Sequence, residues 1–169
     1  MSRRFPYTER MRGTRWLSPT EETAWRAYRR MRARLDLQLA RDLANESGLS
    51  EPDYDVLSTV SEAEGQHLRL KELANSMLWS QSRLSHHVAR MEQRGLVVRE
   101  ECESDGRGAM IVLTPKGWRT IQEAAPGHVG SVRRHLIDLL TPKEMQTLGR
   151  IAEKVVAHLN DPEPRSGVG

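Results

Sequence analysis

Residues 68–117, LRLKELANSMLWSQSRLSHHVARMEQRGLVVREECESDGRGAMIVLTPKG, contain the patterns that decide the fold. Apolar residues recur every three or four positions from Leu70 to Met77 and again from Ser80 to Arg94, which predicts two helices. Only Leu78 and Trp79 separate these two segments. Helices joined so tightly are typical of a helix-turn-helix motif.

The sequence changes character after Gly95. Two runs rich in β-branched residues flank Asp105-Gly106, a dipeptide that favours a tight turn between strands. We therefore predict an antiparallel β-hairpin from about Leu96 to Leu113, directly after the helix-turn-helix.

Helix-start signals predict further helices on both sides of this region. The helix that begins at Thr114-Pro115 keeps its apolar rhythm through Pro126-Gly127 as far as Leu139, so we predict one kinked helix rather than a break. Capping sequences predict the other helix starts, at Ser18-Pro19-Thr20-Glu21, Ser50-Glu51-Pro52-Asp53 and Thr141-Pro142-Lys143-Glu144.

The composition excludes several classes of protein. Its one cysteine, Cys102, cannot form an intrachain disulfide framework, and the acidic neighbours Glu101 and Glu103 do not favour a redox role. No apolar run is long enough for a membrane span or a signal peptide, so we expect a cytoplasmic protein.

The sequence also lacks a catalytic motif, a phosphate-binding Gly loop and a histidine pair spaced for metal binding. We expect no enzyme activity, cofactor or metal.

The net charge of +3 conceals an uneven distribution. Residues 1–34 hold ten arginines and three glutamates, whereas residues 35–68 hold one arginine and eight acids. A basic arm can follow a phosphate backbone, but it can equally be a solvated tail. The arginines concerned are Arg3, Arg4, Arg10, Arg12 and Arg15.

Residues 80–92 divide into two faces on a helical wheel. Leu84, His87, Val88 and Met91 cluster on one side, so we predict that His87 is packed rather than a ligand. The other side is short, polar and cationic, which suits a helix in a DNA major groove, although a solvated surface is the alternative. We predict base contacts from Ser82, Arg83 and His86 and phosphate contacts from Ser80, Gln81 and Arg90. Ser85, on the flank of this face, is a further predicted DNA-binding residue.

The predicted hairpin places Arg107 just after its turn, near Asp105. A cation on a projecting hairpin can enter a narrow minor groove, where the potential is most negative, while Asp105 holds the guanidinium or braces the loop. A plain solvated turn is the alternative reading of the same residues.

The segments LKELANSM, SRLSHHVARMEQRGLVVRE and D-G-R followed by IVLTPKG together resemble the MarR family. The resemblance extends over roughly residues 19–160, and its specific part is residues 68–117. It implies a winged helix-turn-helix in which the helix Ser80–Arg94 reads the major groove of double-stranded DNA and Arg107 enters the minor groove. It also implies a homodimer, often with a small-molecule effector.

We accordingly predict a mainly α fold with a small antiparallel β wing, made of a winged helix-turn-helix and a helical dimerisation region. The predicted segments are a flexible basic arm at 1–17, dimerisation and support helices at 18–67, the DNA-binding lobe at 68–114, dimerisation helices at 115–160 and a flexible tail at 161–169.

The sequence departs from the family pattern at three positions. Arg69 stands where Ser or Thr usually caps a helix, Leu78 where the turn often has Gly, and Trp79 where a smaller aliphatic residue is common. Aromatic and Met side chains could line a pocket for a small aromatic or anionic effector, or could form a dimer core. The candidates are Trp16, Trp25, Tyr28, Met31, Tyr54 and Trp79.

These patterns predict a sequence-specific DNA-binding transcriptional regulator. The resemblance to the MarR family implies that this regulator is a dimeric repressor of a pseudo-palindromic operator. An effector, which such proteins often have, would release it by binding the DNA-competent and incompetent states with different affinities. The alternative is a non-specific architectural DNA-binding protein, in which the arm and wing dominate and bases are not read.

Overall fold

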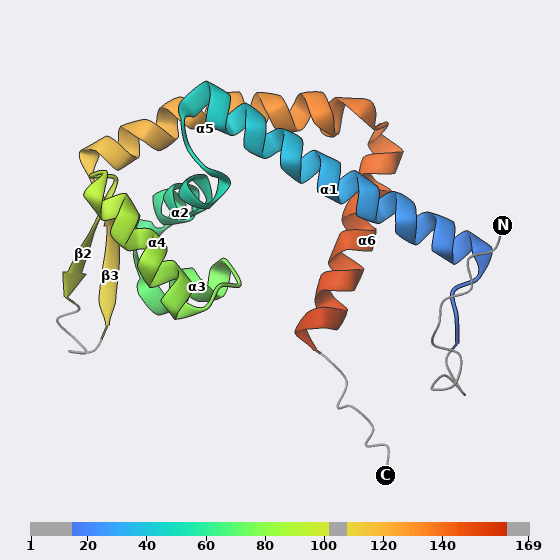
Figure 1. Ribbon diagram of the computed structural model, residues 1–169, viewed down its shortest axis with the longest axis horizontal. Coiled ribbons are helices and arrows are strands. Elements are labelled where there is room, and N and C mark those ends of the chain that lie inside the picture. The colour runs from blue at the N-terminus through green and yellow to red at the C-terminus, as the bar shows by residue number, and fades with distance from the viewer. Residues whose placement is uncertain (1–14, 102–107, 162–169) are drawn as a thin grey trace, which may run out of the picture. The chain divides into compact units, whose positions relative to one another are not determined.

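The computed structural model describes residues 15–101 and 108–161, and they form helices and one small sheet (Figure 1). The chain divides into two compact units, Met1–Asp36 and Leu37–Gly169, with the boundary inside the first helix. The predicted mainly α fold with a small antiparallel sheet is confirmed. The elements are α1 (Pro19–Ser47), α2 (Glu51–Glu62), β1 (His67–Arg69), α3 (Leu70–Ser76), α4 (Gln81–Gln93), β2 (Val97–Glu101), β3 (Ala109–Leu113), α5 (Pro115–His135) and α6 (Pro142–Asn160).

The predicted capping boxes start three of the helices. Before α1, the Ser18 N–H donates to Glu21 Oε2 at 2.7 Å, and the Glu21 N–H donates to Ser18 Oγ at 3.3 Å. The same reciprocal pair forms between Ser50 and Asp53 at α2 and between Thr141 and Glu144 at α6. Each pair satisfies backbone donors that the first turn of a helix leaves open, so the predicted starts are confirmed.

Helices α3 and α4 form the predicted helix-turn-helix beside strands β2 and β3 (Figure 1). The Trp79 N–H donates to the Ala74 carbonyl at 2.9 Å, and the Leu78 N–H donates to the Asn75 carbonyl at 3.1 Å. This Schellman pattern puts Leu78 in the left-handed region, with φ +54°, where glycine is usual. The turn therefore keeps its usual geometry with an unusual residue.

The hydrophobic core lies between the helix-turn-helix, α2, the sheet and the start of α5. Helices α2, α4 and α5 contribute residues mostly three or four positions apart, α1 contributes only Leu43, and the strands contribute residues from one face. Fully buried members include Val56, Leu57, Leu73, Leu84 and Ile111.

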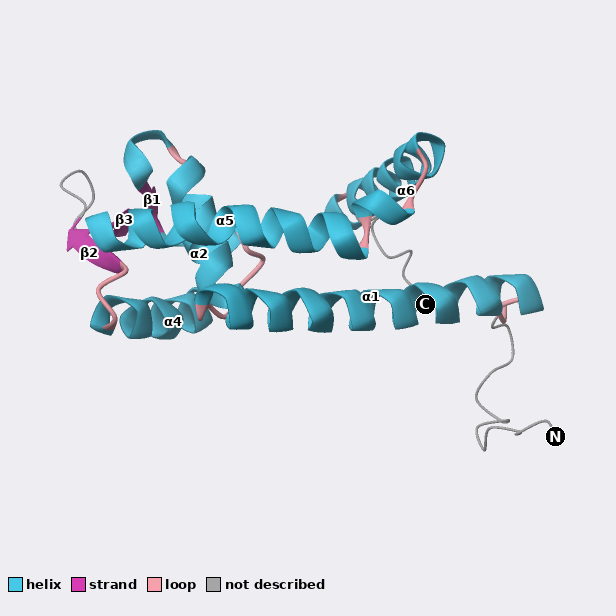
Figure 2. Cartoon of the chain, turned by 90° about the horizontal axis from the view of Figure 1, so that it is seen from above, coloured by secondary structure: helices cyan, strands magenta, loops and turns pink. Residues whose placement is uncertain are grey.

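The predicted hairpin is confirmed by β2 and β3, which pair antiparallel with Val98 opposite Val112. Figure 2 shows how little of the chain is strand. A third strand, β1, pairs antiparallel with β3, so the sheet order is β1-β3-β2. The sequence did not predict β1, because three residues are too few to establish an alternating pattern.

Helix α5 continues through Pro126, which confirms the prediction of one helix. However, it ends at His135 instead of reaching Leu139, and Ile137–Leu139 form a short 3-10 helix. The backbone of Leu136 leaves helical geometry, with φ −139° and ψ −61°. The apolar periodicity therefore extends beyond the end of the helix. Periodicity indicates which residues face inward, but it does not show where the backbone leaves the helical conformation.

None of the helices described over residues 15–101 and 108–161 has both the length and the hydrophobicity to cross a membrane.

Candidate nucleic-acid interface

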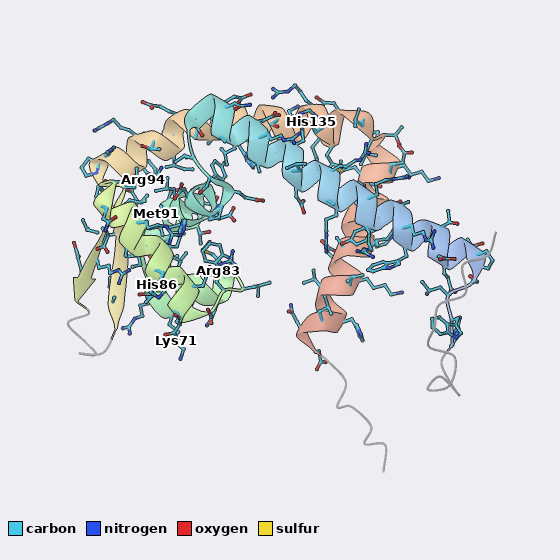
Figure 3. All side chains as sticks on the ribbon, viewed as in Figure 1. Lys71, Arg83, His86, Met91, Arg94 and His135 are labelled. Atoms are coloured by element: carbon cyan, nitrogen blue, oxygen red, sulfur yellow. The ribbon has the colours of Figure 1, made fainter. Side chains whose placement is uncertain are left out.

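Helix α4 has the two faces that the sequence predicted. Leu84, Val88 and Met91 are fully buried, and His87 is only 7% exposed. Ser82, Arg83 and His86 are exposed on the other face, with Arg83 and His86 near the start of the helix (Figure 3). The predicted base-contact residues thus share one solvent-facing surface.

The N-terminal end of α4 presents polar groups. The Arg83 N–H donates to Ser80 Oγ at 3.2 Å, so Ser80 is the N-cap, and its hydroxyl hydrogen can still be donated elsewhere. Gln81 is exposed and lines a hollow of about 630 Å³ between α3 and the start of β3. The hollow is lined by Arg69, Leu70, Lys71, Glu72, Asn75, Gln81, Gly108 and Ala109.

Trp79 has a role that the sequence left open between core and effector cleft. The ring is partly buried against the hydrophobic core. The guanidinium carbon of Arg83 lies 3.9 Å from the centroid of the Trp79 ring, in a cation–π contact. The same ring and the His87 ring form an edge-to-face contact, with centroids 5.7 Å apart and planes at 87°. The four-residue spacing of Trp79 and Arg83 is the one signal that could have predicted this contact.

Ser85 is half-buried and contacts β2. Arg99 donates to the Ser85 carbonyl and, at 3.3 Å, to the Ser85 hydroxyl. Arg99 Nε also lies 3.1 Å from Glu92 Oε2. These contacts attach the middle of α4 to the hairpin, so Ser85 helps to fix the angle between α4 and the hairpin.

A polar cluster around the buried residues Asp53 and His87 attaches α4 to the start of α2. Asp53 is 4% exposed, and its Oδ2 accepts a hydrogen bond from Arg94 Nη1 at 2.7 Å. His87 Nε2 lies 3.2 Å from Asp53 Oδ1, and Arg90 Nη2 lies 2.9 Å from His87 Nδ1. The prediction that His87 is packed is confirmed. No local sequence pattern predicts that Asp53 pairs with His87 and Arg94, because these residues are far apart in the sequence.

The electrostatics of this cluster follow from burial. Burial raises the pKa of Asp53, but the hydrogen bonds from Arg94 and Ser50 outweigh it and leave that pKa below its ordinary value. Burial also lowers the pKa of His87, although the negative charge of Asp53 raises it in part. At neutral pH, His87 is therefore uncharged, and its Nδ1 can accept from Arg90.

The candidate effector residues lie in both compact units. Trp16, Trp25, Tyr28 and Met31 belong to the first unit, where they are exposed, and the Trp25 and Tyr28 rings stack with centroids 5.9 Å apart. Tyr54, in the second unit, packs against the His128 ring, with centroids 4.3 Å apart and planes tilted by 38°.

Tyr54 also lines a cavity of about 340 Å³. Burial raises the pKa of Tyr54 and of Asp55, which lies beside it in the cavity wall. The remaining lining residues are Ser58, Thr59, Ser76 and Met77.

Several predicted residues lie outside the described ranges. These are Asp105 and Arg107 of the wing, Cys102 and the arginines of the arm before Arg15. Arg15 itself has its Nη2 3.6 Å from Glu21 Oε1. Within residues 15–101 and 108–161, no group of three or more His, Cys, Asp or Glu side chains is placed to hold a metal ion.

Comparison with known proteins agrees with this geometry. Residues 47–108 match a model described as MarR family. The transcriptional regulator HosA of Escherichia coli is 28% identical over 133 residues, which cover 78% of this chain and 95% of HosA.

Two solved structures from Streptomyces coelicolor are similar over nearly the whole fold. AbsC, a MarR family transcriptional regulator, is 45% identical with a TM-score of 0.84, covering 87% of this chain and 99% of AbsC. Sco3205, a MarR family regulator solved in complex with DNA, is 37% identical with a TM-score of 0.83, covering 92% and 96% of the two chains. The helix-turn-helix, its flanking hairpin and these similarities lead to one conclusion: the chain belongs to the MarR family of transcriptional regulators.

Proposed function

We propose that the protein regulates transcription by binding specific DNA sequences, with α4 in the major groove. The observation that carries this proposal is the exposed face of α4, where Ser82, Arg83 and His86 lie together above a buried apolar face. Arginine can bond guanine through two hydrogen bonds, and the small Ser82 allows close approach to base edges. These three residues would read bases.

Phosphate contacts would flank the base contacts. Ser80 and Gln81 lie at the N-terminal end of α4, where backbone donors favour an anion. Arg69 and Lys71 line the adjoining hollow together with Gln81. These two basic side chains add positive charge on the same side. Arg90 would be a further phosphate contact once it leaves His87, and Arg107, braced by Asp105, would enter the minor groove.

The active form would be a homodimer. A single chain leaves the apolar face of α6 uncovered, with Ile151, Val155 and Val156 each more than half exposed and Leu159 68% exposed. Trp25, Tyr28 and Met31 on α1 are likewise 44–50% exposed. A second copy would bury such faces and would bring two recognition helices to the half-sites of a pseudo-palindromic operator.

Repression released by a small molecule would complete the mechanism. The cavity beside Tyr54 offers an aromatic ring, the Met77 thioether and hydroxyl groups, which suit a small aromatic effector. Asp55 in its wall disfavours an anionic one. The effector would act by binding the DNA-competent and incompetent states with different affinities.

Selection from a random duplex pool tests the proposal directly. The selected sequence should be pseudo-palindromic, and anisotropy should show it favoured about a thousandfold over a scrambled duplex at about 150 mM salt. A ratio near one would instead identify a non-specific architectural DNA-binding protein.

A variant of Arg83 tests base reading. Arg83→Ala should cost about 1–3 kcal/mol in operator binding and relax the preference at one base position. Arg150→Ala, which removes the same charge from exposed α6, is the matched control and should leave the affinity near that of the parent protein. Equal weakening of Arg83→Ala on all sequences would refute base reading by Arg83.

A further inference from the structure

The contact between Arg83 and Trp79 joins the exposed reading face of α4 to the hydrophobic core. The Arg83 side chain is exposed, yet its guanidinium lies 3.9 Å above the centroid of the Trp79 ring. An exposed arginine ordinarily samples many rotamers, and binding DNA would cost it that freedom. The cation–π contact restricts those rotamers before DNA arrives.

Trp79 is itself held in place by three contacts. Its backbone N–H donates to the Ala74 carbonyl at 2.9 Å in the turn between α3 and α4. One part of the ring packs against the hydrophobic core, and the ring also meets the ring of buried His87 in an edge-to-face contact. His87 in turn lies 3.2 Å from Asp53, which anchors it to α2. The ring is therefore a fixed platform.

Stacking leaves the hydrogen-bonding capacity of Arg83 intact. A guanidinium contacts an aromatic face through its own face, while its five N–H donors lie in the plane of the group and point outward. Two of these donors can still meet O6 and N7 of a guanine. The contact thus orders the arginine without using the donors that would read a base.

We propose that Trp79 is a positioning residue that holds Arg83 ready for base reading, an inference that rests on the function proposed above. The chemical requirement is an aromatic face at position 79. An aliphatic residue there can fill the core but cannot hold a cation. Trp79 would then raise both the affinity for the operator and the preference at the base pair that Arg83 reads.

A double-mutant cycle on the operator tests this proposal. Trp79→Met keeps a large apolar side chain but removes the aromatic face, and should weaken operator binding roughly threefold to tenfold. In the presence of Arg83→Ala the same substitution should change binding by less than about twofold, because the coupled partner is gone. Trp79→Met should also relax the base preference at the position where Arg83→Ala relaxes it.

A second variant separates positioning from folding. Trp79→Phe retains a smaller aromatic face and should keep most of the affinity and the base preference, even if Trp79→Met folds poorly. The proposal would be overturned if Trp79→Met or Trp79→Phe weakened operator binding as much in the Arg83→Ala variant as in the parent protein. Trp79 would then be a core residue without a positioning role. Failure of the proposed function itself is a different result, namely that the parent protein does not prefer the selected duplex over a scrambled one.

Discussion

At the scale of single residues, Leu78 is the most unusual position in the helix-turn-helix. Its backbone is left-handed, with φ +54°, and its side chain is 92% exposed. The left-handed conformation costs a residue with a Cβ atom about 1–2 kcal/mol, whereas glycine adopts it freely. Neither the backbone nor the side chain of Leu78 therefore contributes to stability in the way that a buried leucine does.

We predict that Leu78→Gly stabilises the protein by about 0.5–1 kcal/mol, measured by urea unfolding. The gain is smaller than the strain because glycine also loses more backbone entropy on folding. Leu78→Ala is the control, since it removes the same exposed apolar surface but keeps the Cβ atom. If Leu78→Ala stabilised the protein as much as Leu78→Gly, the exposed side chain and not the backbone would be responsible.

At the scale of elements, the start of α5 depends on a close approach to Leu96, in the segment that joins α4 to β2. A Cβ atom added to Gly117 would lie 1.9 Å from the Leu96 carbonyl oxygen, a backbone atom that cannot move aside. The Gly117 N–H also donates to Thr114 Oγ1 at 2.9 Å, so the residue belongs to the N-terminal cap. Any larger residue must push α5 away from the hairpin.

Gly117→Ala should therefore destabilise the protein by about 2–3 kcal/mol or more in urea unfolding. The matched control is Gly149→Ala on α6, where an added Cβ meets no atom of the described chain within 4 Å. That change should stabilise α6 by about 0.5–1 kcal/mol, because alanine favours helices over glycine. A neutral Gly117→Ala would show that α5 can shift without cost.

A polar cluster also joins the later part of α1 to α5. Asp42 Oδ2 accepts from the buried Ser131 hydroxyl at 2.5 Å and lies 2.9 Å from His135 Nε2, and Asp42 Oδ1 accepts from Gln38 at 2.7 Å. The hydrogen bond from Ser131 is the largest cause that lowers the pKa of Asp42 from 3.8 to about 2. The folded protein therefore favours the ionised carboxylate of Asp42 over its protonated form.

The sign of the pH effect follows from this lowered pKa. Stability from Asp42 is fully present above its unfolded pKa of 3.8 and is lost as the pH falls towards about 2. Both Asp42→Asn and Ser131→Ala should therefore make the fall in stability between pH 4 and pH 2 shallower, as seen in urea unfolding at each pH. Asp36→Asn, at an exposed position of the same helix, is the control. An unchanged acid slope in both variants would contradict the assignment.

The sequence predicted the elements better than the contacts between them. The helix starts, the helix-turn-helix and the hairpin follow from capping residues and periodicity, which are local signals. The strand β1 has only three residues and pairs with β3 about forty positions later, so no local pattern marks it. The pairing of Asp53 with His87 and Arg94 likewise depends on the tertiary fold. Such long-range contacts between charged residues carry no periodicity.

At the scale of the whole molecule, the exposed apolar face of α6 bears on assembly. Ile151 is 54% exposed and Val155 51% exposed in the single chain, at the four-residue spacing of one helix face. Exposed apolar surface of this kind marks an interaction site in a folded protein. In the proposed homodimer, a charge at Ile151 would have to be buried without a partner.

We predict that Ile151→Glu makes the protein monomeric in size-exclusion chromatography with light scattering. Operator affinity should then fall by about a hundredfold or more, because a dimer binds the second half-site as an intramolecular event. Arg150→Gln changes the net charge by the same amount at the neighbouring exposed position and should remain dimeric with full affinity. A dimeric Ile151→Glu protein would move the interface away from α6, whereas a monomer that keeps full operator affinity would refute the need for two recognition helices.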